Sequence, residues 1–327
     1  MSADPRTVYL TGATGFIGNR VARRLAARGD RLRCLVRNPA RADWLRALGA
    51  ELIEGEVTDR AAHERGMRGC TLAYHLAAIY DVGVVDAGKL EQTNVGGTKA
   101  FLEALAETHV SRGIYVSTTV ALGPSGREVS DRIVEYDGPY PTEYHRTKAL
   151  AHRAARLAQE RGLPLIVACP SFVYGPGDNG PGGRFVRDLL RGRMPALLTD
   201  PSWLSFVHVD DIALALELLG ERGKLGGTYV LSGEPASMND FAQRVVKLAG
   251  KRLPLLRFPS AMAAGTGALL DAVTRVTGVS FPITREGVRS TARDRWLHSH
   301  EPATRELDWH PRTLAEGLPD TVKSAGN

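Results

Sequence analysis

The sequence predicts an α/β fold in which a doubly wound parallel sheet is followed by a smaller, mixed C-terminal part. Over the first 170 of the 327 residues, short strand-like runs alternate with amphipathic helical stretches. The strand-like runs are apolar on both faces, which is typical of parallel strands that are covered by helices on each side. Right-handed crossovers between such strands produce the doubly wound arrangement.

The alternation starts with a strand at 7–12 and a helix at 16–30, whose amphipathic pattern ends at Gly29. Runs rich in β-branched and other apolar residues predict the next strands, at 31–37, 50–57, 71–78, 112–119 and 163–171. Apolar residues at helical spacing predict helices at 39–49, 89–108 and 144–161.

The pattern loosens after Pro170, where YGPGDNGPGG indicates a loop at 174–183. Later segments predict helices at 183–192, 210–222, 238–249 and 262–277, and strands at 206–209 and 227–233. We expect two domains: one of residues 1–178 with 203–235 returning to it, and one of residues 179–202 and 236–327.

Composition argues against several classes of protein. The net charge is +6, but the basic residues are scattered, so we expect no nucleic-acid partner. The apolar segment AMAAGTGALL at 261–270 is too short to span a bilayer and the N-terminus lacks a secretory pattern, so we expect no membrane partner. Three scattered cysteines, Cys34, Cys70 and Cys169, favour a reducing, cytoplasmic location.

A glycine-rich turn links the first strand to the first helix. YLTGATGFIG places Gly12, Gly15 and Gly18 where the backbone must turn tightly and approach a ligand closely. The following helix directs its free N–H groups and positive dipole end toward an anion. This context predicts a Rossmann-type dinucleotide-binding site.

The glycine spacing and several later motifs resemble the extended branch of the short-chain dehydrogenase/reductase superfamily, the NAD-dependent epimerase/dehydratase family. The matching motifs, in order, are TGATGFIG, YHLAA (74–78), NVGGT (94–98), YVSTT (115–119), YHRTK (144–148), PSFVYGPGD (170–178) and FVHVDD (206–211). The resemblance covers about residues 7 to 235 and is closest to dihydroflavonol-4-reductase-like enzymes.

Arg37, just past the second strand, bears on the choice of cofactor. An enzyme that uses NAD usually has an acidic residue there, which would repel a 2′-phosphate. Arginine instead offers several donors to that phosphate, so we expect NADP(H) to be preferred, with NAD(H) possible. Arg33 and Arg41 lie nearby and could assist.

The resemblance implies further cofactor contacts along the strand ends. They comprise Gly12, Thr14, Gly15, Phe16 and Ile17 at the diphosphate; Glu56 and Val57 at the adenine; Leu76, Ala77 and Ala78 at the ribose; and Pro170, Ser171 and Val173 at the nicotinamide. His75 and Asn94 are expected to have structural roles, and Tyr174 to face the substrate.

Tyr144 and Lys148 are the expected catalytic pair, since residues four apart share one face of a helix. The ammonium, together with the positive charge of an oxidised nicotinamide, would lower the pKa of the phenol. Lys148 would also hold the ribose. By resemblance Thr118 supplies the catalytic hydroxyl, although Ser117 and Thr119 are close enough for a one-residue error.

The expected activity is reduction of a ketone or aldehyde, with the tyrosine as general acid. The alternative is a sugar-nucleotide epimerase, and a third possibility is a regulator that binds a dinucleotide without turnover. The segment TVALG lacks the acidic pair of dehydratases, which argues against dehydration. By resemblance, helices 88–109 and 142–162 would pair in a homodimer.

Other polar groups receive simpler interpretations. Asp210 and Asp211 are expected to cap a helix. Arg184 and Arg289 are candidates for binding an anionic substrate. His298 and His300 have no partner in a metal-binding motif, so no metal site is expected.

Overall fold

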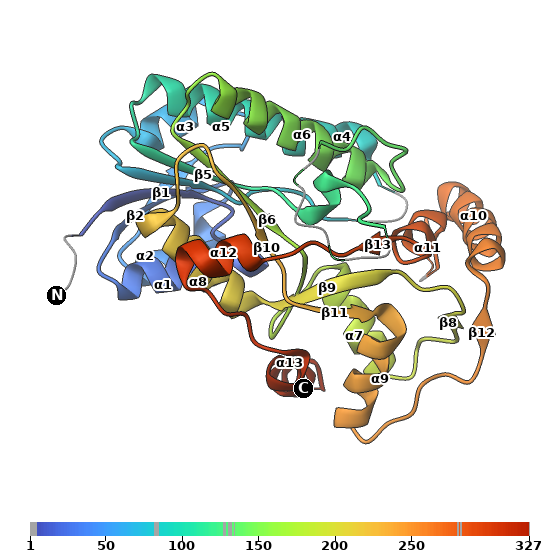
Figure 1. Cartoon of the computed structure of the whole chain (residues 1–327). Helices are drawn as coiled ribbons and strands as arrows, with labels where there is room; N and C mark the ends of the chain where they lie inside the picture. The colour runs from blue at the N-terminus through green and yellow to red at the C-terminus, as the bar shows by residue number, and fades with distance from the viewer. Residues whose placement is uncertain are drawn as a thin grey trace.

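The computed structural model describes residues 5–81, 85–126, 129, 133, 135–279, 281 and 283–326. Figure 1 shows a large sheet between two helical layers, with a smaller group of strands and helices beside it. Within the described ranges, no helix is both long and apolar enough to cross a membrane.

Seven parallel strands form the large sheet, in the order β10-β6-β5-β4-β1-β2-β3. They are β1 (Thr7–Thr11), β2 (Arg31–Val36), β3 (Glu51–Glu54), β4 (Leu72–His75), β5 (Arg112–Val116), β6 (Leu165–Pro170) and β10 (Thr228–Leu231). The predicted α/β fold with a doubly wound parallel sheet is therefore confirmed. The strand order reverses between β1 and β4, and in such sheets a ligand crevice opens at the carboxyl ends next to the reversal.

Helices cover both faces of this sheet, as the apolar strands require. One face packs against α1 (Phe16–Ala27), α2 (Asp43–Ala47), α8 (Val209–Arg222) and α12 (Glu301–Leu307). The other face packs against α3 (Arg60–Met67), α5 (Gly97–Glu107) and α6 (Glu143–Glu160). Figure 1 shows α3, α5 and α6 in one layer above the sheet and α1, α2, α8 and α12 below it.

The helices of the first half differ from the sequence prediction in two places. The sequence pattern does not reveal α3, because RAAHERGM is mostly polar and its helix is only eight residues long. The single helix expected at 89–108 is instead α4 (Ala87–Glu91), a π-helical turn (Gln92–Gly96) and α5. The π-helical turn contains Asn94, which is buried and bonded to the chain after β4.

A smaller sheet follows, built from strands that the sequence pattern only partly reveals. Its strands are β7 (Phe172–Tyr174), β9 (Trp203–His208), β11 (Glu234–Ser237) and β13 (Arg295–Trp296). Helices α7 (Pro181–Leu190), α9 (Met238–Leu248) and α13 (Leu314–Gly326) pack on it around a core in which the rings of Phe206 and Phe241 stack at 4.4 Å. Because β7 begins two residues after β6 ends, the two sheets meet at the predicted crevice.

The remaining elements lie at the outer edge of the smaller part. Strands β8 (Leu197–Leu198) and β12 (Arg257–Phe258) pair with each other, and helices α10 (Ser260–Thr277) and α11 (Arg285–Ser290) follow. Figure 1 shows α10 at the periphery of the molecule, on the far side of α11 from the large sheet.

Candidate active site

The turn between β1 and α1 has no room for side chains at its glycines. Gly12 has φ +73°, and a Cβ there would lie 2.7 Å from the backbone nitrogen of Ala77. A Cβ on Gly18 would lie 2.0 Å from the Gly12 carbonyl oxygen. Such contacts are prohibitive, so the packing of α1 against the turn requires glycine at both positions.

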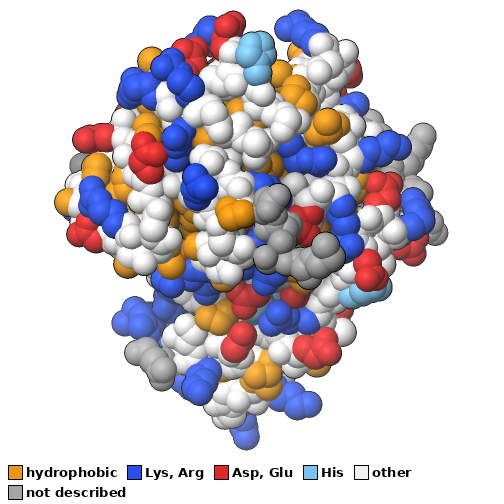
Figure 2. Space-filling model, turned by 90° about the vertical axis from the view of Figure 1, so that its left-hand side faces the viewer, with side chains coloured by type: hydrophobic (Ala, Val, Ile, Leu, Met, Phe, Trp, Pro, Cys, Tyr) orange, Lys and Arg blue, Asp and Glu red, His pale blue; other side chains and the backbone are white. Residues whose placement is uncertain are grey.

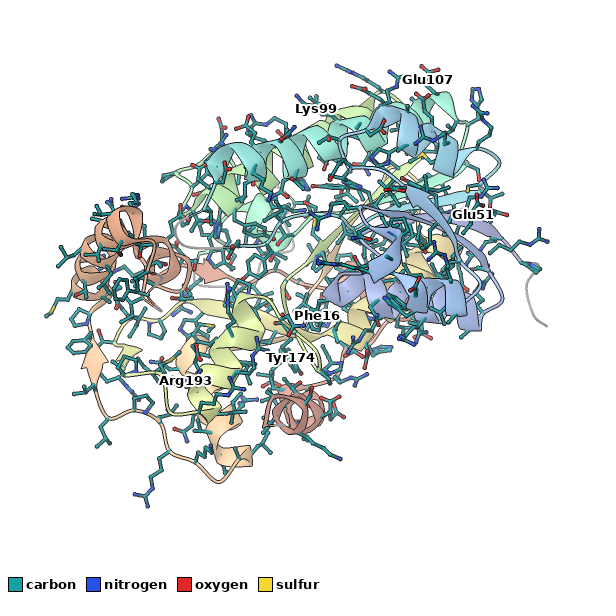
Figure 3. All side chains as sticks on the ribbon, turned by 180° about the vertical axis from the view of Figure 1, so that it is seen from behind. Phe16, Glu51, Lys99, Glu107, Tyr174 and Arg193 are labelled. Carbon is teal, nitrogen blue, oxygen red and sulfur yellow. The ribbon has the colours of Figure 1, made fainter. Side chains whose placement is uncertain are left out.

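The start of α1 suits a diphosphate. Its N-cap, Gly15, provides no side-chain hydrogen bond, and the first turn contains no acidic residue. The free N–H groups and the positive end of the helix dipole are therefore available to an anion. Figure 3 shows Phe16 at this helix start, between the large sheet and the smaller part.

The other expected cofactor contacts follow the carboxyl ends of neighbouring strands. In the sheet register, Thr11 lies beside Leu35 and His75. Because the strands are parallel, Arg37, Glu56 and the segment 76–78 follow at the same edge as the glycine turn. Arg37 and Glu56 are exposed, and neither side chain has a hydrogen bond or ion pair within the described structure.

A cleft of about 670 Å³ brings the glycine turn together with the expected catalytic residues. Its lining includes, from the expected set, Gly12, Thr14, Gly15, Phe16, Ile17, Leu76, Ala78, Thr118, Tyr144, Lys148, Pro170, Ser171 and Val173. Arg37, Glu56, Val57 and Ala77 are not among the lining residues. The cleft therefore unites a diphosphate-binding turn with a phenol, a hydroxyl and an ammonium.

Tyr144 lies in the first turn of α6, which Thr142 caps by accepting a hydrogen bond from the His145 N–H at 3.3 Å. The phenol ring packs against Tyr80, with ring centroids 4.7 Å apart. Burial raises the pKa of Tyr144, and the nearby Thr118 hydroxyl partly opposes this. The phenol is therefore protonated at neutral pH, as a proton donor must be.

Lys148 is buried one turn further along α6. Its ammonium donates a hydrogen bond to the Val116 carbonyl at 3.0 Å and lies 3.4 Å from the Tyr115 hydroxyl. Burial lowers the pKa of Lys148 to about 8. The sequence predicts that Lys148, together with the charge of an oxidised cofactor, lowers the pKa of Tyr144. In the chain alone, burial raises that pKa instead.

The three hydroxyl residues after β5 differ in their surroundings. Ser117 hydrogen-bonds His152 at 2.9 Å, on the side of the sheet covered by α6. Thr119 begins a short 3-10 helix (Thr119–Leu122) and is buried. All three residues line the cleft, and the Thr118 hydroxyl lowers the pKa of the nearby Tyr144 phenol, which favours Thr118 as the catalytic hydroxyl.

His75 and Asn94 have structural surroundings, as expected. His75 is buried between the hydroxyls of Thr11 and Thr98, at 3.0 and 3.3 Å, and burial lowers its pKa. Asn94 accepts a hydrogen bond from the Ile79 N–H at 2.8 Å and donates one to the Ile79 carbonyl at 3.1 Å. These contacts fix the chain that leaves β4 beside the cleft.

Two other expectations are wrong in detail. The cap of α8 is His208, whose Nδ1 accepts from the Asp210 N–H at 3.2 Å, whereas Asp211 pairs with Arg312 at 3.0 Å. Tyr174 does not face the substrate side of the cleft, since it is only 2% exposed and packs edge-on against Phe241.

The two arginines expected near an anionic substrate do not line the cleft. Arg184 is exposed on α7 and pairs with Asp81 at 3.2 Å. Arg289 is exposed in the last turn of α11.

The sequence does not single out the apolar part of the lining, which includes Tyr80, Val116, Val120, Phe172, Leu204 and Trp296. Phe172 lies inside the motif PSFVYGPGD, so its position was accessible from the sequence. Trp296 comes from the C-terminal part of the chain, where no local sequence motif assigns it to the cleft. Among the described residues, the charged side chains of the lining are Arg20, Asp178 and Lys148.

Comparison with known proteins gives consistent matches over most of the chain. Residues 8–232 match the family described as NAD dependent epimerase/dehydratase. Sterol demethylase protein B of Methylococcus capsulatus is 31% identical over 82% of this chain and 82% of its own length. The 4-hydroxy-2-methyl-3-oxo-4-farnesyl-3,4-dihydroquinoline-1-oxide ketoreductase of Stigmatella aurantiaca is 29% identical over 97% of this chain and 96% of its own. The crystal structure of gox2253 is 31% identical, with a TM-score of 0.82, and the alignment covers 98% of this chain and 97% of that one.

Proposed function

Because the chain belongs to the NAD-dependent epimerase/dehydratase family, it is an NAD(P)-dependent enzyme, and we propose that it reduces an uncharged, largely apolar ketone or aldehyde with NADPH. The observation that carries this proposal is the composition of the cleft. It joins the glycine turn to Thr118, Tyr144 and Lys148, and it also contains a group of aromatic and aliphatic side chains: Tyr80, Val116, Val120, Phe172, Leu204 and Trp296.

The cleft favours an apolar carbonyl compound over a sugar nucleotide. A substrate with a diphosphate needs cationic partners outside the cofactor site. Among the described residues, Arg20 is the one arginine of the lining; it donates to the Pro176 carbonyl at 2.6 Å and pairs with Asp210 at 3.5 Å, so it is already engaged. Two relatives support this preference, since their names refer to a sterol and to a farnesyl-bearing quinoline oxide.

The reaction follows from the positions of three side chains. When bound, NADPH supplies a hydride with its electron pair to the carbonyl carbon. The Thr118 hydroxyl donates a hydrogen bond to the carbonyl oxygen, and the Tyr144 phenol gives that oxygen its proton. The Lys148 ammonium favours the phenolate that remains, which then regains a proton from solvent.

The cofactor preference rests on Arg37. This guanidinium is exposed, has no partner among the described residues and follows β2 at the edge that contains the glycine turn. It is therefore free to pair with a 2′-phosphate, whereas Arg33 is bonded to Glu51 at 2.8 Å. We propose NADP(H) as the preferred cofactor on this ground.

The decisive test is turnover of a panel of apolar ketones and aldehydes with NADPH and NADH side by side. Tyr144→Phe is expected to lower kcat about 10²- to 10⁴-fold and leave NADPH binding, measured by fluorescence, unchanged. Unaltered kcat in this variant would contradict the role of the phenol. Purified protein that retains NAD and interconverts sugar nucleotides without net redox change would support the epimerase alternative instead.

We also propose a homodimer formed through helices 88–109 and 142–162. Helices α5 and α6 lie side by side on the outer layer (Figure 1), and Lys99 and Glu107 point outward from α5 (Figure 3). Sedimentation velocity should give twice the chain mass of 35.3 kDa, and a monomer at micromolar concentration would refute the dimer.

A further inference from the structure

Helix α10 presents apolar residues to solvent and small or polar residues to the protein, the reverse of an ordinary surface helix. Gly267 and Asp271 are buried against α11, where Asp271 accepts a hydrogen bond from the Arg285 N–H at 3.0 Å. Leu269 and Val276, by contrast, are 67% and 87% exposed.

The exposed apolar residues form a stripe. Met262, Leu269, Val273 and Val276 recur at helical spacing, so they lie on one side of α10. Together with the residues around β12, they define what we call the α10 face: Leu255, Leu256, Phe258, Met262, Leu269, Val273, Val276 and Val279. These eight are more than half of the large hydrophobic side chains exposed in the described structure. Such a concentration indicates a binding surface.

The exposed charges of the segment that carries the α10 face have one sign. The sequence from 251 to 285 contains five basic residues, all of which are exposed: Lys251, Arg252, Arg257, Arg275 and Arg285. Its single acidic residue, Asp271, is buried. On the opposite side of the molecule, Figure 2 shows basic and acidic side chains interspersed.

We propose that the α10 face docks on the surface of an anionic phospholipid bilayer. Its apolar side chains would enter the zone below the headgroups, while the surrounding cations would pair with lipid phosphates. A second copy of the chain fits the face less well, because it would bring the same excess of positive charge against it. A surface contact of this kind needs no helix that spans the bilayer.

The α10 face is connected to the cleft. Helix α11, on which α10 packs, contains Glu286, whose carboxylate accepts a hydrogen bond from the Glu143 N–H at 3.3 Å. Glu143 precedes Tyr144. Docking would therefore hold the active-site end of α6 close to the bilayer, where apolar molecules are dissolved. The proposal does not depend on the proposed function, since docking is measured without turnover.

The test is flotation of the full chain with vesicles of phosphatidylcholine alone or with one-third phosphatidylglycerol. The protein should float with the anionic vesicles and detach at high salt. Leu269→Ser/Val276→Ser should lower the bound fraction about tenfold, because two apolar anchors are lost. The matched control is Leu225→Ser/Leu248→Ser, which changes two exposed residues elsewhere and should bind like the unaltered protein.

A second variant, Arg257→Ala/Arg275→Ala, should remove most of the dependence on phosphatidylglycerol without touching the apolar stripe. Absence of flotation, or equal flotation of all variants, would overturn the proposal. Self-association that disappears in Leu269→Ser/Val276→Ser, with no vesicle binding by the unaltered protein, would identify a second copy as the partner instead.

Discussion

Replacement of Lys148 by methionine should stabilise the fold in a way that depends on pH. Lys148 is 4% exposed, and burial lowers its pKa to about 8 from an ordinary value of 10.5. Between these values the unfolded chain binds a proton that the folded chain does not, so stability rises with pH across this window. The stability that comes from keeping Lys148 neutral is fully present above pH 10.5 and is lost as the pH falls to 8.

The size of the effect follows from the shift. Each pKa unit is worth about 1.4 kcal/mol, so charging buried Lys148 costs about 3 kcal/mol of stability at neutral pH. Moving from pH 7 to pH 9.5 should recover about 2 kcal/mol of that cost in the unaltered protein. Lys148→Met removes the titrating group and should lose this increment.

The assay is urea unfolding of both proteins at the two pH values, followed by tryptophan fluorescence. For each protein, the change in the free energy of unfolding between the two pH values is determined, and the two changes are compared. Other groups titrate equally in both proteins, so the difference reports on Lys148. Lys224→Met, at an exposed loop position, is the control and should keep the slope of the unaltered protein. An identical slope for Lys148→Met would show that the buried ammonium is not destabilised, and the reasoning would fail.

Arg37→Ala should raise the Kd for NADPH at least tenfold and that for NADH little, whereas equal weakening would mean that the guanidinium does not bind the phosphate. Thr118→Val should lower kcat about 10- to 100-fold, while Ser117→Ala, whose hydroxyl is bonded to His152, should keep kcat and cost about 1 kcal/mol of unfolding free energy; the reverse pattern would shift the catalytic role by one residue. Gly18→Ala places a methyl group 2.0 Å from the Gly12 carbonyl and should abolish cofactor binding, detectable as loss of NADPH-induced thermal stabilisation; a normal shift would show that the turn can relax.

The sequence predicts best the features that depend on local patterns. The alternation of strands and helices, the glycine turn and the i, i+4 pair of Tyr144 and Lys148 can all be identified within short windows. The sequence does not predict which way Lys148 turns, because its partner, the Val116 carbonyl, belongs to a strand distant in the chain. For the same reason Trp296 could not be assigned to the cleft.

The orientation of helix α10 is another feature that the sequence pattern does not predict. The helix itself is predicted at 262–277, but the direction of its apolar side is not, since pattern analysis assumes that apolar residues turn inward. In the structure, Gly267 decides the packing instead: a Cβ there would lie 2.6 Å from the Arg285 backbone nitrogen. The close approach of α11 to this glycine leaves the apolar stripe on the outside.

The late position of β10 in the chain has a consequence for biosynthesis. This strand completes the large sheet by pairing with β6, yet it follows β9 of the smaller sheet in sequence. A growing chain shorter than 228 residues therefore exposes the open edge of β6, a template for intermolecular pairing. Ribosome-bound intermediates should need a chaperone until Leu231 has left the exit tunnel, and C-terminal truncations before that residue should aggregate rather than yield an isolated nucleotide-binding domain.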